Sequence, residues 1–191
     1  MMTNSSGRGL PPDLSQIKVT DSDSNGSQIL YFAFGSNLFT QRIQINNPKA
    51  CHHTIGKLQN YRLEFFGYSP EWRGATASVV ESNRSEVWGV VWKIPLSELN
   101  NLDRQEGSYD VCQVPIVTHE GHILQCRTYQ LKSATGEIGK PSRVYKACMV
   151  QGAIEHNLPQ HYVEKLQNIE DNGYEGCVDI PVNIKKLFNT N

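Results

Sequence analysis

Hydrophobic and polar positions divide most of the chain into short apolar segments separated by turn residues. The first segment, residues 29–34, is aromatic and is followed by Gly35-Ser36-Asn37, a pattern typical of a buried strand and a turn. The segment 87–92 is apolar on both faces and should lie centrally in a sheet. Similar patterns predict strands over residues 55–66, 75–80, 111–117 and 123–131, the last two joined as a hairpin across Glu120-Gly121.

Helical spacing appears in three places. Ser36 and Asn37 suit the N-cap of a short helix over residues 38–45. A second helix should begin at Pro95 and end at Gly107, with Glu98 and Asp103 on its solvated face. The apolar faces of this helix and of a third, late one are predicted from their spacing: Leu96, Leu99 and Leu102, then Leu158, Tyr162, Leu166 and Ile169. This order of elements favours an α+β fold with a strongly curved, mixed or barrel-like sheet.

The two ends of the chain differ in composition from its middle. Residues 1–28 are rich in Ser, Gly and Asp and offer almost nothing to pack, so we expect a disordered N-terminal tail. Residues 187–191 should form a flexible C-terminal end. The remaining residues, 29–186, are enough for one hydrophobic core and show no internal repeat, which predicts a single domain.

Composition and charge exclude several classes of protein. Lys and Arg number 18 and Asp and Glu 19, a formal net charge of −1, so no bulk attraction for nucleic acid is expected. No apolar run approaches the roughly 20 residues that span a membrane. The N-terminal tail contains no hydrophobic secretory segment. The five cysteines are odd in number and widely spaced, which indicates reduced thiols and a cytoplasmic protein.

Metal and thiol chemistry find little support in the sequence. His119, His122 and Cys126 fall on the predicted hairpin and residues 51–53 read Cys-His-His, but neither spacing is a recognised structural zinc set. Cys148 has no histidine in register that would activate it as a nucleophile. We therefore expect no metal site among these residues.

Two segments carry a candidate chemistry, and the first is residues 31–38. Here a strand ends in Gly35-Ser36-Asn37 and continues into a helix, so several backbone N–H groups are available at one point. Together with the helix dipole, these donors would bind a carboxylate or an oxyanion. The alternative is an ordinary tight turn between a strand and a helix.

The second segment, residues 101–107, lies at the end of the predicted second helix. Glu106 follows Leu102 by four residues and therefore lies on the buried side of the helix. Burial and the negative end of the helix dipole both disfavour a carboxylate anion, and both raise its pKa, as a general base near neutral pH requires. The alternative is that the helix ends one residue earlier and Glu106 points to water.

These two segments belong to a larger set of motifs. Residues 31–38 (YFAFGSNL), 86–93 (EVWGVVWK) and 102–107 (LDRQEG) together resemble the γ-glutamylcyclotransferases in order and spacing. The resemblance extends over residues 29–170 and implies a small mixed β-barrel flanked by helices. It also implies a homodimer and a reaction without metal or organic cofactor, in which a γ-glutamyl amino acid is split into 5-oxoproline and the free amino acid. Three shorter stretches match as well: residues 126–131, 145–149 and 157–159.

The resemblance also assigns roles to individual residues. Glu106 would be the general acid/base. Tyr129 and Tyr145 would line the pocket, although each could equally be a core aromatic. The family's turn usually reads Tyr-Gly-Ser-Asn, so this chain lacks one hydroxyl at Phe34. That loss would change substrate affinity or preference if the hydroxyl holds the substrate, but it leaves the base in place. The γ-glutamyl group would be cradled by Tyr31, Phe32, Ala33, Phe34, Gly35, Ser36, Asn37 and Leu38.

Three functions follow from these residues. The interpretation we adopt is a cyclotransferase acting on γ-glutamyl amino acids, whose leaving amino acid meets residues 69–74. The second is the same ring closure on another γ-glutamyl compound, such as glutathione or a γ-glutamyl amine. The third is a non-catalytic ligand-binding or interaction module of the same fold, against which the presence of Glu106 in its Gln-Glu-Gly context argues.

Overall fold

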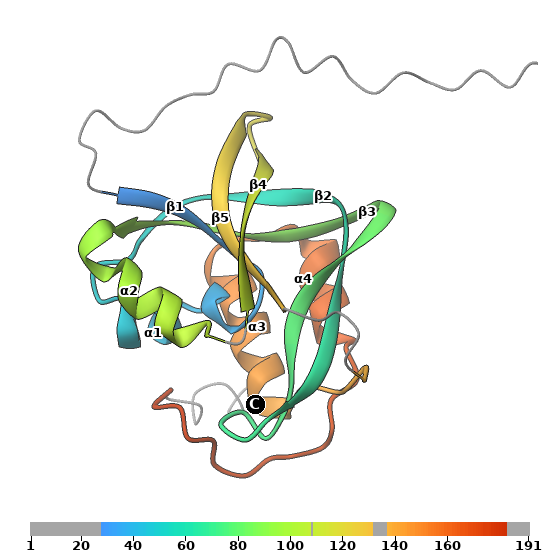
Figure 1. The fold of residues 1–191 in the computed structure, drawn as a ribbon. Coiled ribbons are helices and arrows are strands. Elements are labelled where there is room, and N and C mark those ends of the chain that lie inside the picture. Colours follow the sequence, from blue (N-terminus) through green and yellow to red (C-terminus); the bar gives the residue numbers. More distant parts are fainter. Residues whose placement is uncertain (1–27, 108, 132–136, 183–191) are drawn as a thin grey trace, which may run out of the picture.

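The computed structural model describes residues 28–107, 109–131 and 137–182. The predicted N-terminal tail lies outside these residues except for Gln28, which begins the first strand, and residues 187–191 lie outside them too. Five strands close into a barrel in the order β1-β3-β2-β4-β5 (Figure 1). The strands are β1 (Gln28–Ala33), β2 (Cys51–Ser69), β3 (Gly74–Pro95), β4 (Tyr109–Thr118) and β5 (Ile123–Leu131).

The barrel is mixed, as the sequence predicts. Neighbouring strands are antiparallel except β1 and β5, which pair in parallel where Tyr31 faces Arg127 and so close the barrel. The apolar half of β3, residues 87–92, lies between β1 and β2 and is buried throughout, which confirms its central position. The predicted hairpin is formed by β4 and β5.

The β2–β3 ribbon is longer than predicted. The two strands expected over 75–80 and 87–92 are parts of the single strand β3, because β2 pairs with both ends of the polar run between them, while residues 82–85 bulge out of the register. At that point Glu81 pairs with Tyr61 and Glu86 with Gln59, so the two strands differ in length and the register shifts. Asn60 and Arg84 adopt positive φ angles of 61° and 63° there. Figure 1 shows the ribbon bending sharply and then running alongside the helices.

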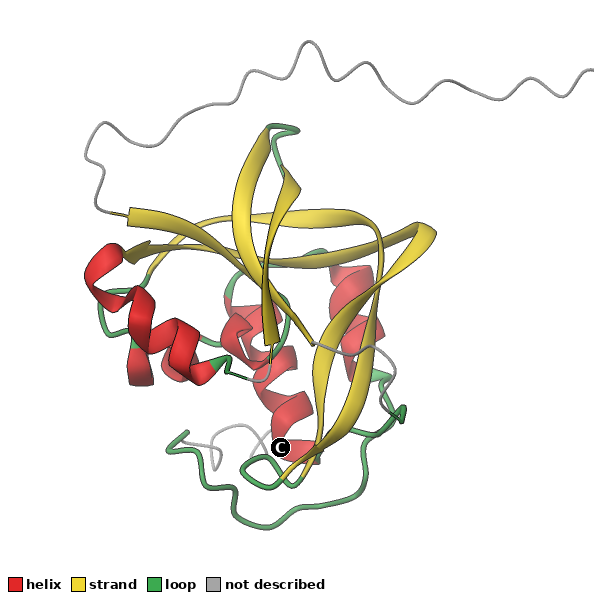
Figure 2. Ribbon diagram, viewed as in Figure 1, coloured by secondary structure: helices red, strands yellow, loops and turns green. Residues whose placement is uncertain are grey.

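In the described part of the chain, four α-helices flank one side of the barrel (Figure 2). The helix expected over residues 38–45 begins later, because Ser36–Leu38 form a single 3₁₀ turn and Phe39, not Ser36 or Asn37, is the N-cap of α1. The late helix is also shorter than its apolar spacing suggests, since Leu158 and Ile169 lie beyond its ends. The helix preceding it is not predicted by the sequence. The four helices are α1 (Thr40–Asn46), α2 (Leu96–Gln105), α3 (Arg143–Glu155) and α4 (Gln160–Gln167).

The buried face of α2 is rotated from the predicted one. Leu102 is fully buried, but Leu96 is 47% exposed and Glu98 is buried in its place. The Glu98 carboxylate accepts a hydrogen bond from the Lys49 backbone N–H at 3.2 Å, which compensates for its loss of water. The prediction that Glu98 lies on a solvated face is therefore wrong.

The turn after β1 is fixed by its neighbours. Gly152 of α3 packs against it so closely that a Cβ at this position would lie 2.3 Å from the Leu38 carbonyl carbon. On the other side, the Trp92 indole N–H donates to the Asn37 carbonyl at 3.1 Å. The turn is thus held between α3 and the barrel, which gives its side chains fixed positions.

Within the described residues, no helix is long and apolar enough to cross a membrane.

Candidate functional site

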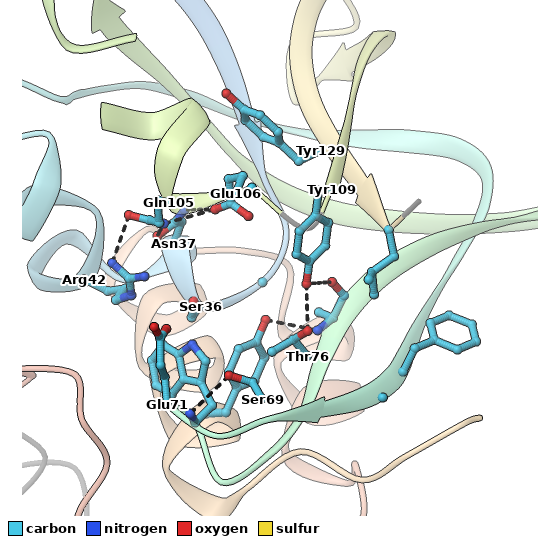
Figure 3. A pocket seen from close by; sticks show the side chains of 18 of the residues that line it. Ser36, Asn37, Arg42, Ser69, Glu71, Thr76, Gln105, Glu106, Tyr109 and Tyr129 are labelled. Atoms are coloured by element: carbon cyan, nitrogen blue, oxygen red, sulfur yellow. Dashed lines mark hydrogen bonds between the residues drawn. The ribbon is translucent and has the colours of Figure 1, made fainter. Parts of the chain in front are cut away.

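A cavity of about 690 Å³ lies beside the turn that follows β1. Its walls are formed by this turn, the end of α2 and the residues that join β2 to β3 (Figure 3). Strands β4 and β5 and helix α3 contribute Tyr109, Tyr129 and Tyr145. The polar and charged side chains that line it are Tyr31, Ser36, Asn37, Arg42, Tyr68, Ser69, Glu71, Thr76, Arg104, Gln105, Glu106, Tyr109, Tyr129 and Tyr145.

The structure brings together most of the predicted site residues, but not all of them. Eight line the cavity: Tyr31, Phe34, Gly35, Ser36, Asn37, Glu106, Tyr129 and Tyr145. Phe32, Ala33 and Leu38 do not line it, because their side chains are buried in the hydrophobic core. The Phe32 carbonyl is also used by the fold, since it accepts a hydrogen bond from the Thr128 hydroxyl at 2.8 Å.

Glu106 projects into the cavity from the C-terminus of α2. The helix ends one residue before it, at Gln105, but the Glu106 N–H still donates to the Leu102 carbonyl at 3.1 Å. Its Oε1 accepts hydrogen bonds from the side-chain amides of Asn37 (3.1 Å) and Gln105 (3.0 Å). Among the described residues none is hydrogen-bonded to Oε2. One oxygen is therefore held in place and the other is available to a ligand.

The surroundings of Glu106 perturb its acidity. Burial raises the pKa of this carboxyl above its ordinary value, because an anion loses solvation in the cavity. The hydrogen bond from Gln105, the positive charge of Arg42 and the hydrogen bond from Asn37 each lower it, and burial outweighs them. The shift has the direction that a general base working near neutral pH needs.

Asn37 and Gln105 form a network that sequence reasoning missed. Asn37 Nδ2 donates to the Tyr31 hydroxyl at 3.0 Å as well as to Glu106, and its Oδ1 accepts from Gln105 Nε2 at 3.2 Å. Gln105 Oε1 in turn accepts from Arg42 at 3.1 Å. The side-chain amide of Asn37, expected as a helix cap, instead donates a hydrogen bond to the Glu106 carboxylate.

Tyr145 lies on α3 with its hydroxyl at the glycine turn. The hydroxyl oxygen accepts a hydrogen bond from the Ala77 backbone N–H at 3.1 Å and interacts with the Ser36 backbone N–H. Burial raises the pKa of Tyr145 to about 12, so the hydroxyl keeps its proton at neutral pH and can donate it to a ligand. Gly35 permits this arrangement, because a Cβ there would lie 2.8 Å from the Tyr145 oxygen.

Tyr129 presents its ring, rather than its hydroxyl, to the site. The hydroxyl donates to Asp103 Oδ1 and accepts from Arg127 Nε at 3.0 Å. Figure 3 shows it directed away from Glu106. The ring packs edge-on against Tyr31 with the two centroids 5.7 Å apart. Asp103, predicted on a solvated face, is half-buried in this cluster, where it also pairs with Arg127.

Tyr109 is a further cavity residue that no sequence pattern predicts. It begins β4, and its hydroxyl contacts the Thr76 hydroxyl at 2.7 Å and the Ala77 carbonyl at 3.2 Å. Burial is the main cause of a strongly raised pKa for this tyrosine. Strand alternation shows which side chains share a face, but not that this one meets β3 beside the cavity.

The histidines and cysteines do not assemble into a second site. Among the described residues, no group of three or more His, Cys, Asp or Glu side chains could hold a metal ion. His119 and His122 are exposed, whereas Cys126 is fully buried. None of the five cysteines, all of which lie in the described ranges, forms a disulfide. Burial raises the pKa of Cys148 to about 12, which keeps its thiol protonated.

Known proteins are similar to this chain in sequence and in fold. Residues 86–166 match the AIG2-like family. A γ-glutamylcyclotransferase from Bos taurus is 42% identical over 162 residues, covering 81% of this chain and 85% of its own. The Homo sapiens γ-glutamylcyclotransferase is 43% identical over 157 residues, covering 78% and 82% of the two chains. The chain belongs to the γ-glutamylcyclotransferase family.

The fold agrees with this membership. A solved γ-glutamyl cyclotransferase superposes with a TM-score of 0.76 at 42% sequence identity, over 79% of this chain and 93% of the other. The mixed barrel with flanking helices is therefore the γ-glutamylcyclotransferase fold, as the sequence motifs imply. The chain is accordingly an enzyme, and its cavity, with Glu106 at its wall, is the candidate active site of this family member.

Proposed function

We propose that this enzyme converts a γ-glutamyl amino acid into 5-oxoproline and the free amino acid, with Glu106 as general acid and base. The observation that carries the proposal is the state of the Glu106 carboxylate. One oxygen is fixed by Asn37 and Gln105, the other is free of partners among the described residues, and burial raises its pKa. Family membership supports the choice of reaction.

The reaction is an intramolecular transfer. The α-amino nitrogen of the γ-glutamyl group attacks its own γ-carbonyl carbon, a C–N bond closes the five-membered ring, and the original amide C–N bond breaks. In water this amine is mostly protonated and cannot attack. Glu106 takes a proton from the ammonium group so that the amine can attack, and passes it to the departing nitrogen. The ring nitrogen then gives up its second excess proton to the same carboxylate, so one carboxylate serves both half-steps.

The cavity also supplies conformational restraint. The γ-glutamyl chain must fold back on itself before the ring can close. Holding it in that conformer removes an entropic cost, part of the roughly 7–11 kcal/mol that good orientation contributes at most. The rings of Tyr31 and Tyr129 and the buried turn after β1 provide rigid walls for this purpose.

The developing oxyanion needs donors in the same cavity. We assign this role to the backbone N–H groups of Gly35 and Asn37 and to the Tyr145 hydroxyl. The hydroxyl accepts a hydrogen bond from the Ala77 N–H at 3.1 Å, which leaves its own proton to donate. The loss of one such donor typically costs about 3 kcal/mol of transition-state stabilisation.

The leaving amino acid is proposed to lie against residues 69–72, between β2 and β3. Ser69, Glu71 and Trp72 line the cavity there. The Ser69 hydroxyl accepts a hydrogen bond from the Trp72 backbone N–H at 3.3 Å. Figure 3 places Ser69 and Glu71 on one wall and Glu106 on another. A leaving group bound between them would keep its amide near Glu106.

The direct test is the Glu106→Gln variant. Glutamine keeps the size and hydrogen-bonding shape of the side chain but cannot accept the amine proton. Release of 5-oxoproline from γ-glutamyl-alanine should fall by at least about 100-fold, while the melting temperature stays at or above that of the wild type. Glu164→Gln, the same change at an exposed position outside the cavity, is the matched control. Full activity in Glu106→Gln would remove the proposed base.

The setting of the enzyme is part of the proposal. We expect a cytoplasmic homodimer that acts in glutathione metabolism. The absence of disulfides among its five cysteines supports a cytoplasmic location, and similarity to the family supports the homodimer and the role in glutathione metabolism.

We also propose that residues 29–186 form one domain. A chain shortened to begin at Gln28, the first residue of β1, should keep the wild-type kcat/KM and melting temperature, and sedimentation velocity should give twice the monomer mass.

A further inference from the structure

Arg42 carries a buried positive charge that the mechanism above does not use. The side chain belongs to α1, is 5% exposed and lines the cavity. Its NH1 donates to Gln105 Oε1 at 3.1 Å, and its guanidinium carbon lies 5.7 Å from the centre of the Trp72 ring. Its Nε is buried and has no hydrogen-bond partner among the described residues.

No carboxylate neutralises this guanidinium directly. Among the described residues, no Asp or Glu oxygen lies within the 4.0 Å of Arg42 that an ion pair requires. The charge acts on Glu106, but the two side chains are joined only through Gln105. A buried cation that lacks a counter-charge is costly to the fold, and an anion bound in the cavity beside the guanidinium would supply that charge.

We propose that Arg42 binds the α-carboxylate of the γ-glutamyl group, so that Arg42 and Glu106 together recognise its α-amino acid head. This inference rests on the proposed function. The planar guanidinium suits a carboxylate because it offers parallel N–H donors. The negative charge of the carboxylate also complements the positive charge of Arg42, which lies on the cavity wall next to Gln105, the neighbour of Glu106.

The hydrogen bonds that link Arg42 to Glu106 through Gln105 indicate which of the two substrate carboxylates Arg42 binds. The α-amine must reach the free oxygen of Glu106, and the α-carboxylate is attached to the same carbon as that amine. Arg42 is separated from Glu106 by one side-chain amide, that of Gln105, so a group adjacent to the amine meets the guanidinium. The carboxylate of the leaving amino acid lies beyond the scissile amide, at the opposite end of the substrate.

This assignment predicts selectivity for a free α-carboxylate. The test compares three substrates: γ-glutamyl-alanine, its analogue with the glutamyl α-carboxylate converted to a carboxamide, and γ-glutamyl-ethylamide, which lacks only the alanine carboxylate. Each is measured as kcat/KM for release of the leaving amine, alanine or ethylamine, with the wild type and with Arg42→Met. Because the same substrates are used with both enzymes, intrinsic differences in their reactivity cancel.

In the wild type, amidation of the α-carboxylate should lower kcat/KM about 10- to 100-fold, the range for a hydrogen bond between charged groups. In Arg42→Met the same amidation should change it by less than about threefold. Removal of the alanine carboxylate should have the same effect in both enzymes. Arg104→Met, which removes an exposed guanidinium lining the same cavity, should keep the wild-type sensitivity to amidation.

Equal sensitivity of wild type and Arg42→Met to amidation would overturn the proposal, and so would a coupling of Arg42 to the alanine carboxylate instead. If Arg42→Met does not fold, Arg42→Lys, which keeps the charge but loses the planar fork, should show a reduced sensitivity. Calorimetric binding of γ-glutamyl-alanine and the carboxamide to wild type and variant repeats the comparison without turnover. It therefore separates a failure of this inference from a failure of the proposed reaction.

Discussion

Replacement of Asn37 by leucine isolates the contribution of the network that holds the base. Leucine fills nearly the same space but removes three hydrogen bonds at once. The lost bonds are those to the Tyr31 hydroxyl (3.0 Å), to Glu106 Oε1 (3.1 Å) and from Gln105 (3.2 Å). Glu106 keeps only the hydrogen bond from Gln105, and its carboxylate becomes free to rotate away from the substrate amine.

The size of the effect follows from the groups involved. A hydrogen bond to a charged acceptor contributes about 1.5–3 kcal/mol, so kcat/KM should fall about 10- to 150-fold if the orientation of Glu106 is fully used in the transition state. The Tyr31 hydroxyl is also left buried without its donor, since this residue is 5% exposed. That change should lower the free energy of unfolding by about 1–3 kcal/mol.

The two effects are measured separately. Product release from γ-glutamyl-alanine gives kcat/KM, and urea unfolding gives the stability. Asn101→Leu is the matched control, because its amide donates to the Asn46 carbonyl at an exposed position on α2, the helix that Glu106 directly follows. The control should change the stability by no more than about 0.5 kcal/mol and leave the rate unaltered. A wild-type kcat/KM in Asn37→Leu would refute the idea that the position of Glu106 is set by this amide.

Three further predictions concern the fold and its pH dependence. Gly152→Ala should cost at least about 2 kcal/mol in urea unfolding, because its Cβ would lie 2.3 Å from the Leu38 carbonyl carbon; an unchanged stability would contradict the packing of α3 on the turn. Folding raises the pKa of Glu106, so the stability linked to this group is present at low pH and lost as the pH rises through the folded value. Glu106→Gln should therefore melt above the wild type at about pH 8, with a smaller difference at about pH 4, and a constant difference in calorimetry would argue against the raised pKa. His52 and His156 stack with centroids 4.8 Å apart, and burial lowers the pKa of both, so their contribution to stability is present above the unfolded pKa and lost as the pH falls; His156→Phe should shrink the drop in melting temperature between about pH 7.5 and about pH 5.5, whereas an unaltered drop would show that the pair does not titrate in this way.

The parts of the site that the sequence predicts are those set by local pattern. An aromatic strand followed by Gly-Ser-Asn predicts a turn with available backbone donors, and the structure places Gly35, Ser36 and Asn37 on the cavity wall. The position of Glu106 follows from its spacing to Leu102. The helix ends one residue earlier than assumed, yet the carboxylate stays in the cavity because side chains from two elements hold it.

The parts that the sequence does not predict depend on contacts between distant segments. Arg42 lies on a short polar helix, and nothing in its neighbourhood along the chain indicates that it is buried against Trp72. Tyr109 reaches the cavity only because β4 brings it beside Thr76. Leu96, by contrast, fits the apolar period of its helix and is nevertheless exposed.

Contacts between distant segments also explain where the predicted elements differ from the observed ones. The polar run within β3, residues 81–86, is typical of a loop, but its two end residues pair with β2, so the strand continues through a bulge and a sharp bend. Likewise, Ser36 and Asn37 have the composition of helix caps. The side-chain amide of Asn37 donates to the Glu106 carboxylate instead, and α1 begins after Phe39 without a side-chain cap. Tertiary hydrogen bonds override local preference at these positions.

The most direct test of the account is a titration of the Glu106 carboxyl itself. The protein is labelled with ¹³C at glutamate side-chain carboxyls, and the Glu106 resonance is assigned by its disappearance in Glu106→Gln. The account predicts a pKa above the ordinary glutamate value, matching the acidic limb of the wild-type kcat/KM profile. A Glu106 pKa at or below the ordinary value, or an acidic limb that persists unchanged in Glu106→Gln, would contradict it.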